Sequence, residues 1–185
     1  MDRIILDEGK MTLPPLTLVI GGAASGKSAH AEALVRAQTG QRVYIASAQA
    51  FDDEMRAKIA AHRAARAGDG WRTVEAPYDV AGAVGALREG EVALFDCATF
   101  WLSNLMLAER DWQEEADRLL AALATRRAPV VVVSNETGQG IVPENKLARA
   151  FRQAQGELNQ RLAAGADLVI AVMAGLPMVL KQERP

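Results

Sequence analysis

The chain has 185 residues, of which 50% are hydrophobic and 24% are charged, so we expect one domain with a substantial core and exclude wholesale disorder. Lysine and arginine total 21 against 23 acidic residues, giving a net charge of -2, and without an overall basic field we expect no nucleic-acid partner. The single cysteine, Cys97, excludes an internal disulfide framework and favours a cytoplasmic location.

The start of the chain does not resemble an export signal. Asp2, Asp7 and Glu8 interrupt its short apolar stretch. We expect residues 1–15 to form a loose leader and residues 16–185 to form a single domain. The longest apolar run, residues 168–180, is too short to cross a bilayer and contains Gly175 and Pro177. We therefore expect no membrane insertion.

Short apolar runs alternate with helical periodicity through the rest of the chain. Strands are expected at residues 16–20, 43–46, 92–95, 130–133 and 168–172, with shorter pieces at 71–75 and, after a turn at 175–177, at 178–180. Helices are expected from Lys27 to a stop at Gly40, from Asp52 to about Arg66, at 79–88, 99–108 and 112–126, and from Pro143 to 164. Such apolar strands separated by helices predict an α/β fold, in which a mostly parallel sheet carries helices on both faces as a three-layer α/β/α arrangement.

A phosphate-binding loop (P-loop) follows the first expected strand. The pattern G-x-x-x-x-G-K-[ST] is matched in full by Gly21, Gly22, Ala23, Ala24, Ser25, Gly26, Lys27 and Ser28. The loop lies between an apolar strand and a helix start, where backbone N–H groups and the helix N-terminus attract phosphate oxygens. Lys27 is expected to reach the β- and γ-phosphates, and Ser28 to place its hydroxyl on Mg²⁺. The sequence thus predicts a P-loop NTPase-type nucleotide site.

Asp96 is the expected acidic partner of this loop. It ends the apolar run 92–95, which is how an aspartate that binds the metal of a P-loop is presented. Capping of the next helix is the alternative for such a residue. Ser28 and Asp96 are the expected Mg²⁺ ligands. Glu136, beyond the strand at 130–133, is either a base or metal-shell ligand or part of a polar turn.

His62 is one of two histidines in the chain. It follows Met55 and Ile59 at helical spacing, so it continues the apolar stripe of that helix. Arg63 and Arg66 lie beside it and could bind nucleotide phosphates while the imidazole attacks a phosphorus. The alternative is a half-buried helix histidine next to a solvated basic face, and the spacing alone favours this structural role.

The order of several motifs resembles one enzyme family along residues 16–181. The matching stretches are GGAASGKS (21–28), YIASAQ (44–49), DDEM (52–55), HRAAR (62–66), WRTVE (71–75), DC with WLSNL (96–97 and 101–105), SNETGQGIVP (134–143), NQ (159–160) and GLPMVLK (175–181). The chain is similar in this set to the adenosylcobinamide kinase / adenosylcobinamide-phosphate guanylyltransferase family, which acts late in cobalamin biosynthesis.

The resemblance implies a bifunctional enzyme. Its kinase activity phosphorylates adenosylcobinamide with ATP or GTP. Its second activity transfers GMP from GTP to adenosylcobinamide phosphate through a guanylyl-histidine intermediate, releasing pyrophosphate. The resemblance makes His62 the nucleophile. A single-activity P-loop small-molecule kinase and a nucleotide-dependent regulatory switch are the alternatives.

The resemblance also implies further contacts and an assembly. Nucleotide contacts beyond the P-loop are expected from Ala46, Ser47, Ala48, Arg63, Ala64, Ala65, Arg66, Glu75 and Asp96. Mg²⁺ is the expected cofactor, and adenosylcobinamide and its phosphate are the expected substrates besides the nucleotides. A homo-oligomer, a trimer by resemblance, is the expected assembly.

Overall fold

The structure is a computed structural model that describes residues 13–49 and 68–182. Its strands are β1 (Leu16–Gly21), β2 (Gln41–Ala46), β3 (Trp71–Glu75), β4 (Glu91–Asp96), β5 (Val130–Asn135), β6 (Leu168–Met173) and β7 (Leu176–Gln182). Its helices are α1 (Lys27–Arg36), α3 (Val80–Gly85), α4 (Ala98–Leu107), α5 (Trp112–Ala124) and α6 (Lys146–Gly165). The helix expected from Asp52 to about Arg66 lies outside the described residues.

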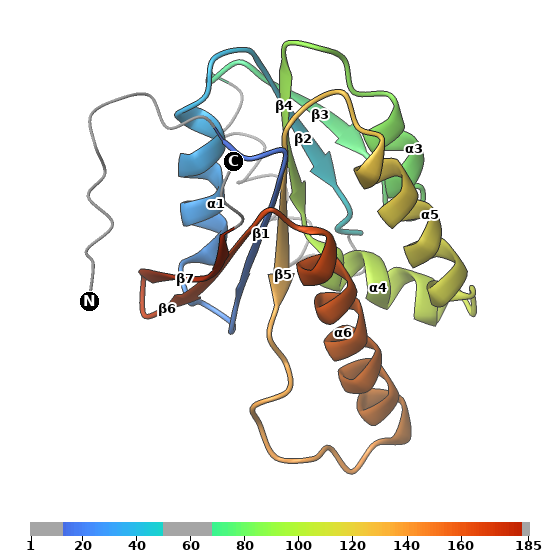
Figure 1. The fold of residues 1–185 in the computed structure, drawn as a ribbon. Helices are drawn as coiled ribbons and strands as arrows, with labels where there is room; N and C mark the ends of the chain where they lie inside the picture. The colour runs from blue at the N-terminus through green and yellow to red at the C-terminus, as the bar shows by residue number, and fades with distance from the viewer. Residues whose placement is uncertain (1–12, 50–67, 183–185) are drawn as a thin grey trace.

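One sheet forms the middle layer (Figure 1), in the strand order β3-β2-β4-β5-β1-β6-β7. Neighbouring strands are parallel except β6 and β7, which form an antiparallel hairpin. The strand that leads into the P-loop, β1, is central, between β5 and β6. Because all the strands except β7 are parallel, their carboxyl ends lie at the same end of the sheet, where ligands of open α/β sheets bind.

Helices cover both faces of the sheet, which confirms the three-layer α/β/α prediction. On one face, Ala31, Leu34 and Val35 of α1 pack with Val19 and Val133. On the other face, the core includes buried residues of α3, α4, α5 and α6. Side chains alternate between these two cores along β1, β4 and β5, as expected for strands buried on both faces.

The apolar runs predicted as strands are all confirmed, and the run at 71–75 is confirmed as β3. Several boundaries differ from those predicted. The last helix begins at Lys146 and not at Pro143, because the Asn145 side chain accepts a hydrogen bond from the Ala148 N–H and caps it there. The last hairpin turns at Ala174 and Gly175, both at positive φ, so β7 begins at Leu176, inside the turn expected at 175–177.

The first helix is shorter than expected. It ends at Arg36, where the Ala37 N–H donates to the Ala33 carbonyl and the Gln38 N–H donates to the Val35 carbonyl, so the stop comes before Gly40. Gly40 instead has φ 115° and lies against the Gly90 carbonyl, where a Cβ atom would approach to 2.3 Å. This glycine therefore allows two loops to meet, and it does not itself end the helix.

Part of the expected leader packs against the domain. Leu13 is buried, and its N–H donates to Gln38 Oε1 at 3.2 Å. Residues 1–12 lie outside the described part. Among the described helices, none combines the length and the apolar character that a bilayer crossing needs.

Candidate active site

The carboxyl ends of five neighbouring strands bring the candidate residues together. Across β3, β2 and β4, Glu75 pairs with Ala46, which in turn pairs with Asp96. Across β5 and β1, Asn135 pairs with Gly21, the first residue of the P-loop. Residues from distant parts of the sequence thus line the same end of the sheet, as the positions of the motifs predicted.

The P-loop has the tight geometry that its glycines predict. A Cβ atom on Gly21 would lie 2.5 Å from both Ser25 Oγ and the Val172 carbonyl oxygen. Gly26, the N-cap of α1, has φ 91°, a value that favours glycine. The Lys27 ammonium donates to the Gly22 carbonyl at 3.0 Å, so it folds back over the loop that would hold the phosphates. The loop thus presents a cation and a helix N-terminus together.

The β6–β7 hairpin supports the P-loop from the side. The Gly175 N–H donates to the Ser25 carbonyl at 2.8 Å. A Cβ atom on Gly26 would lie 3.2 Å from the Gly175 Cα, so the two backbones are in close contact. The loop conformation therefore depends on a turn that lies about 150 residues further along the chain, as the positions of Ser25 and Gly175 show.

Asp96 lies at the end of β4 and accepts a hydrogen bond of 2.8 Å from the Tyr44 hydroxyl. Tyr44 is buried in β2 and packs edge-to-face on Trp71, with ring centroids 6.1 Å apart. The helix that follows is capped by Cys97, whose sulfur accepts from the Phe100 N–H. Capping was the alternative role for Asp96, and the structure gives that role to the next residue.

Ser47 joins the ends of β2 and β4 beneath the surface. Its hydroxyl donates to the Cys97 carbonyl at 2.7 Å and accepts from the Cys97 N–H at 2.9 Å. The Asn104 amide of α4 donates to the carbonyls of Ser47 and Pro77. Ser47 is fully buried, whereas Ala46 and Ala48 are half-buried. The nucleotide contacts that the resemblance implies for these three residues stay predictions.

Cys97 is a buried thiol next to the site. Burial, and after it the neighbouring Asp96 carboxylate, raise the pKa of the Cys97 thiol to about 12, although backbone hydrogen bonds and Lys27 act in the opposite direction. The thiol is therefore protonated at neutral pH and is a poor nucleophile. Burial also lowers the pKa of His30, on α1.

A buried polar network holds the end of β5. Ser134 Oγ donates to Asn159 Oδ1 at 2.6 Å, and Gln155 Nε2 donates to both of these oxygens. Asn159 Nδ2 donates to the Asn135 carbonyl at 3.0 Å, and the Asn135 N–H donates to Thr99 Oγ1 at 2.8 Å. This network fixes the backbone that enters the loop at 136–145. In that loop the Glu136 carboxylate accepts a hydrogen bond from the Gly138 N–H, and a role for Glu136 as a base or metal-shell ligand stays a prediction.

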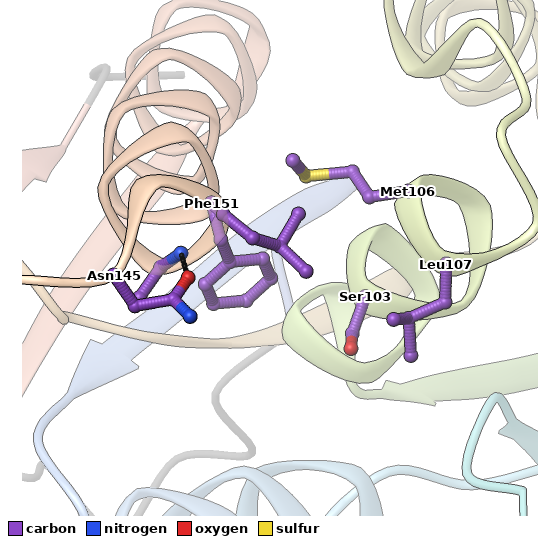
Figure 2. A pocket seen from close by; sticks show the side chains of 7 residues that line it. Ser103, Met106, Leu107, Asn145 and Phe151 are labelled. Atoms are coloured by element: carbon purple, nitrogen blue, oxygen red, sulfur yellow. Dashed lines mark hydrogen bonds between the residues drawn. The ribbon is translucent and has the colours of Figure 1, made fainter.

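An open pocket of about 260 Å³ lies between α4 and α6. Figure 2 shows Phe151 of α6 facing Ser103, Met106 and Leu107 of α4 across this pocket. Asn145, Leu147 and Ala148 complete its lining, which is mainly apolar. Exposed apolar side chains, Leu107 and Leu147, lie at its rim. Such a lining suits an apolar part of a ligand and not a phosphate.

The predicted site residues divide into two groups. The first group lies at the carboxyl end of the sheet and comprises the P-loop, residues 46–48, Glu75 and Asp96. The remaining ones lie outside the described residues: His62, Arg63, Ala64, Ala65 and Arg66. In the described ranges, no three histidine, cysteine or acidic side chains cluster as a metal site.

Sequence reasoning missed three residues of the site. Tyr44 was assigned no role, although it contacts Asp96, because the pairing of β2 with β4 is not visible from sequence order. Asn135 was noted only as part of the stretch 134–143, and Thr99 was not singled out. The signal for Thr99 was that it lies within a few residues of the end of an apolar strand.

Comparison with known sequences identifies relatives along almost the whole chain. The family model described as "Cobinamide kinase / cobinamide phosphate guanyltransferase" matches residues 17–180. The "Bifunctional adenosylcobalamin biosynthesis protein CobU" of Salmonella typhimurium is 42% identical over 182 residues, covering 90% of this chain and 99% of that protein. The "Bifunctional adenosylcobalamin biosynthesis protein CobP" of Pseudomonas aeruginosa is 44% identical over 170 residues, covering 90% of this chain and 97% of that protein.

Solved structures support the fold. The RadB recombinase matches with a TM-score of 0.52 and 17% identity, over 86% of this chain and 75% of that one. The flagellar accessory protein FlaH of Methanocaldococcus jannaschii matches with a TM-score of 0.52 and 13% identity, over 92% and 80%. At these identities the likeness shows the P-loop NTPase-type fold alone.

Proposed function

Because this chain belongs to the cobinamide kinase / cobinamide phosphate guanyltransferase family, it is a bifunctional enzyme of adenosylcobalamin biosynthesis, and we propose that both of its reactions use the one P-loop described above. The kinase step phosphorylates the hydroxyl of adenosylcobinamide with ATP or GTP. The second step transfers GMP from GTP to adenosylcobinamide phosphate and releases pyrophosphate.

The observation that supports this proposal is the arrangement of Lys27 and Asp96 around the same sheet end. Lys27 begins the helix that follows β1, and Asp96 ends β4 on the face covered by that helix, where it contacts Tyr44. A lysine that binds phosphates and a carboxylate suited to a metal–water shell are the groups that phosphoryl and nucleotidyl transfer share. Ala46, Ser47, Ala48 and Glu75, near Asp96, belong to the proposed nucleotide site.

The residues present fit Mg²⁺. The Ser28 hydroxyl and the Asp96 carboxylate supply hard oxygen donors, and Mg²⁺ commonly binds through one carboxylate together with phosphate oxygens and waters. We assign these two residues as its ligands. When bound, the ion would neutralise negative charge on the nucleotide phosphates.

We propose that His62 carries the GMP group. In this step an imidazole nitrogen attacks the α-phosphorus of GTP, a P–N bond forms, and pyrophosphate leaves. An oxygen of the substrate phosphate then attacks the same phosphorus, the P–N bond breaks, and the histidine is regenerated. Arg63, Ala64, Ala65 and Arg66 would contact the nucleotide beside it. This proposal rests on the family motif, since these residues lie outside the described part.

Labelling with α-³²P GTP tests this route. The wild-type chain is expected to retain label after denaturation and to release it in acid, as a P–N bond does. The variant His62→Ala should retain none. His30→Gln provides the matched control, because His30 is the other histidine of the chain, and it should label normally. An unlabelled wild type that still forms adenosylcobinamide-GDP would overturn the histidine route.

Product analysis separates the other two functions. A single-activity kinase would stop at adenosylcobinamide phosphate, and a regulatory switch would bind nucleotide and form no corrinoid product. The two named activities of the relatives favour the bifunctional enzyme over both.

We also propose a cytoplasmic homotrimer. Strand β7 is an edge strand of the sheet and carries exposed Leu176, Met178 and Leu180. Burial of these side chains against another copy of the chain would remove apolar surface from water. Light scattering of the purified protein measures its assembly, and a monomer at micromolar concentration would contradict this proposal.

A further inference from the structure

Asn135 lies between the two halves of the nucleotide site. In the sheet, β5 is flanked by β4 on one side and β1 on the other. Asp96 of β4 pairs with Val133, and Gly21 of β1 pairs with Asn135. Asn135 therefore lies two residues further toward the carboxyl end of the sheet than the position paired with Asp96, directly beside the start of the P-loop. A side chain at this position is close to both groups that handle the phosphates.

The strand alternation indicates the direction of this side chain. The Ser134 hydroxyl bonds to Asn159 on the α6 face. The Asn135 side chain should project toward the opposite face, like Val131 and Val133, which pack in the core with Val35 of α1. The P-loop leads into α1 on that face. Asp96 shares it, since its carboxylate contacts Tyr44 of the same core.

Hydrogen bonds hold the backbone of Asn135, and its side-chain amide takes part in none of them. Its N–H donates to Thr99 Oγ1 at 2.8 Å, and its carbonyl accepts from Asn159 Nδ2 at 3.0 Å. The next N–H, that of Glu136, donates to the Gly21 carbonyl at 3.0 Å and links the strand end to the P-loop. Within the described ranges, the Asn135 amide makes no hydrogen bond of its own. It is thus positioned precisely and available for a ligand.

The chemistry of an amide suits a phosphate. Its Nδ2 atom donates two hydrogen bonds and carries no negative charge, so it does not repel the phosphate oxygens as a carboxylate would. We infer that Asn135 binds the terminal phosphate of the bound nucleoside triphosphate through its Nδ2 group. This inference rests on the proposed function, and it adds a residue that distinguishes a triphosphate from a diphosphate at the shared P-loop.

The role predicts a consequence for each reaction. In the kinase step, Asn135 would hold the phosphate that is transferred. In the guanylyl step, it would hold the outer phosphate of the pyrophosphate that leaves. One residue would then serve both reactions, because the same triphosphate occupies the loop in each.

Calorimetric binding tests the inference without any turnover. The ligands are Mg²⁺ complexes of GDP and of the non-hydrolysable β,γ-imido analogue of GTP. We expect Asn135→Ala to weaken binding of the triphosphate analogue about tenfold or more and to leave GDP binding within about twofold, as for one lost hydrogen bond to a charged group. Asn135→Asp should weaken the triphosphate further by repulsion. An equal loss for both nucleotides, or no loss, would overturn the inference.

Controls separate this result from other causes. Gln113→Ala removes an exposed side-chain amide from the start of α5, a helix that carries none of the proposed site residues, and should leave both affinities unchanged. Thermal unfolding of each variant verifies the fold, and Asn135→Ser gives the same comparison if the alanine variant does not fold. Because binding alone is measured, the result does not depend on whether His62 carries GMP.

Discussion

The Tyr44 hydroxyl and the Asp96 carboxylate meet at 2.8 Å across neighbouring strands. The two residues are 52 positions apart in the sequence, and only the pairing of β2 with β4 brings them together. The hydroxyl thus orients a carboxylate that we assign to the metal shell, in the way that outer-shell hydrogen bonds orient metal ligands.

Replacing Tyr44 by phenylalanine should separate orientation from packing. Tyr44→Phe keeps the edge-to-face contact with Trp71 and removes the hydrogen bond to Asp96. We expect the Mg²⁺ concentration needed for half-maximal activity to rise about tenfold, in line with the effect of outer-shell partners on metal sites. Titrating Mg²⁺ at saturating GTP measures this change. An unchanged Mg²⁺ requirement would show that Asp96 does not depend on Tyr44.

Removal of the P-loop cation should abolish both reactions together. Lys27→Ala eliminates the ammonium that lies over the loop, and each activity is expected to fall by at least about a hundredfold, because both transfers develop charge on phosphates at this loop. The two rates are measured separately, the second with adenosylcobinamide phosphate supplied. Retention of guanylyl transfer in this variant would indicate a second nucleotide site.

Two adjacent glycines provide a matched pair. Gly21→Ala places a methyl group 2.5 Å from the Val172 carbonyl, whereas Gly22→Ala meets nothing within 4 Å. We expect the first to lower the free energy of unfolding by about 1–3 kcal/mol, as overpacked sites do, and the second to change it by less than about 0.5 kcal/mol. Denaturant unfolding without nucleotide measures both. Equal values would contradict the tight packing of Gly21.

The buried thiol of Cys97 should make the protein less stable in alkali. Its pKa is raised from 9.0 to about 12 in the folded state by burial first and by Asp96 second. Above about pH 9 the unfolded chain loses this proton while the folded chain keeps it, so the free energy of unfolding falls as the pH rises from about 9 toward about 12, and the full contribution is present below that window.

A serine variant isolates this effect. Cys97→Ser retains a cap for the Phe100 N–H and does not titrate in this range. Between about pH 8 and about pH 10.5, the wild type should lose roughly 2 kcal/mol more than the variant, at 1.36 kcal/mol per pKa unit. Urea unfolding at the two pH values provides the comparison. Identical losses would show that the thiol ionises freely in the folded chain.

Local patterns were sufficient for the strands and the P-loop. Runs such as 130–133 are apolar throughout because both faces of β5 are covered, and the P-loop has a fixed spacing. The start of α6 was harder, since Pro143 and Asn145 both carry helix-start signals. The structure favours Asn145, while Arg149 and Arg152 bind the carbonyls of Pro143 and Ile141 and hold the preceding loop in place.

Contacts between distant strands could not be predicted in the same way. The sequence placed Asp96 at a strand end, but the neighbours of that strand follow from the sheet order, which no local pattern encodes. The Asn135 position has the same origin, because its pairing with Gly21 joins segments more than a hundred residues apart. The role of a side chain could therefore be predicted where it follows from the position of that side chain in its own strand. It could not be predicted where it depends on which strand lies next to it.

The central place of β1 has a consequence for synthesis on the ribosome. The strand is made early, yet its neighbours β5 and β6 come from the second half of the chain: Leu16 pairs with Val130, and Thr17 pairs with Leu168. A nascent chain that ends before these segments lacks the strands that pair with β1 and position the P-loop. Gly175, whose N–H donates to the Ser25 carbonyl, is made later still. The growing polypeptide should therefore bind nucleotide only when translation is almost finished.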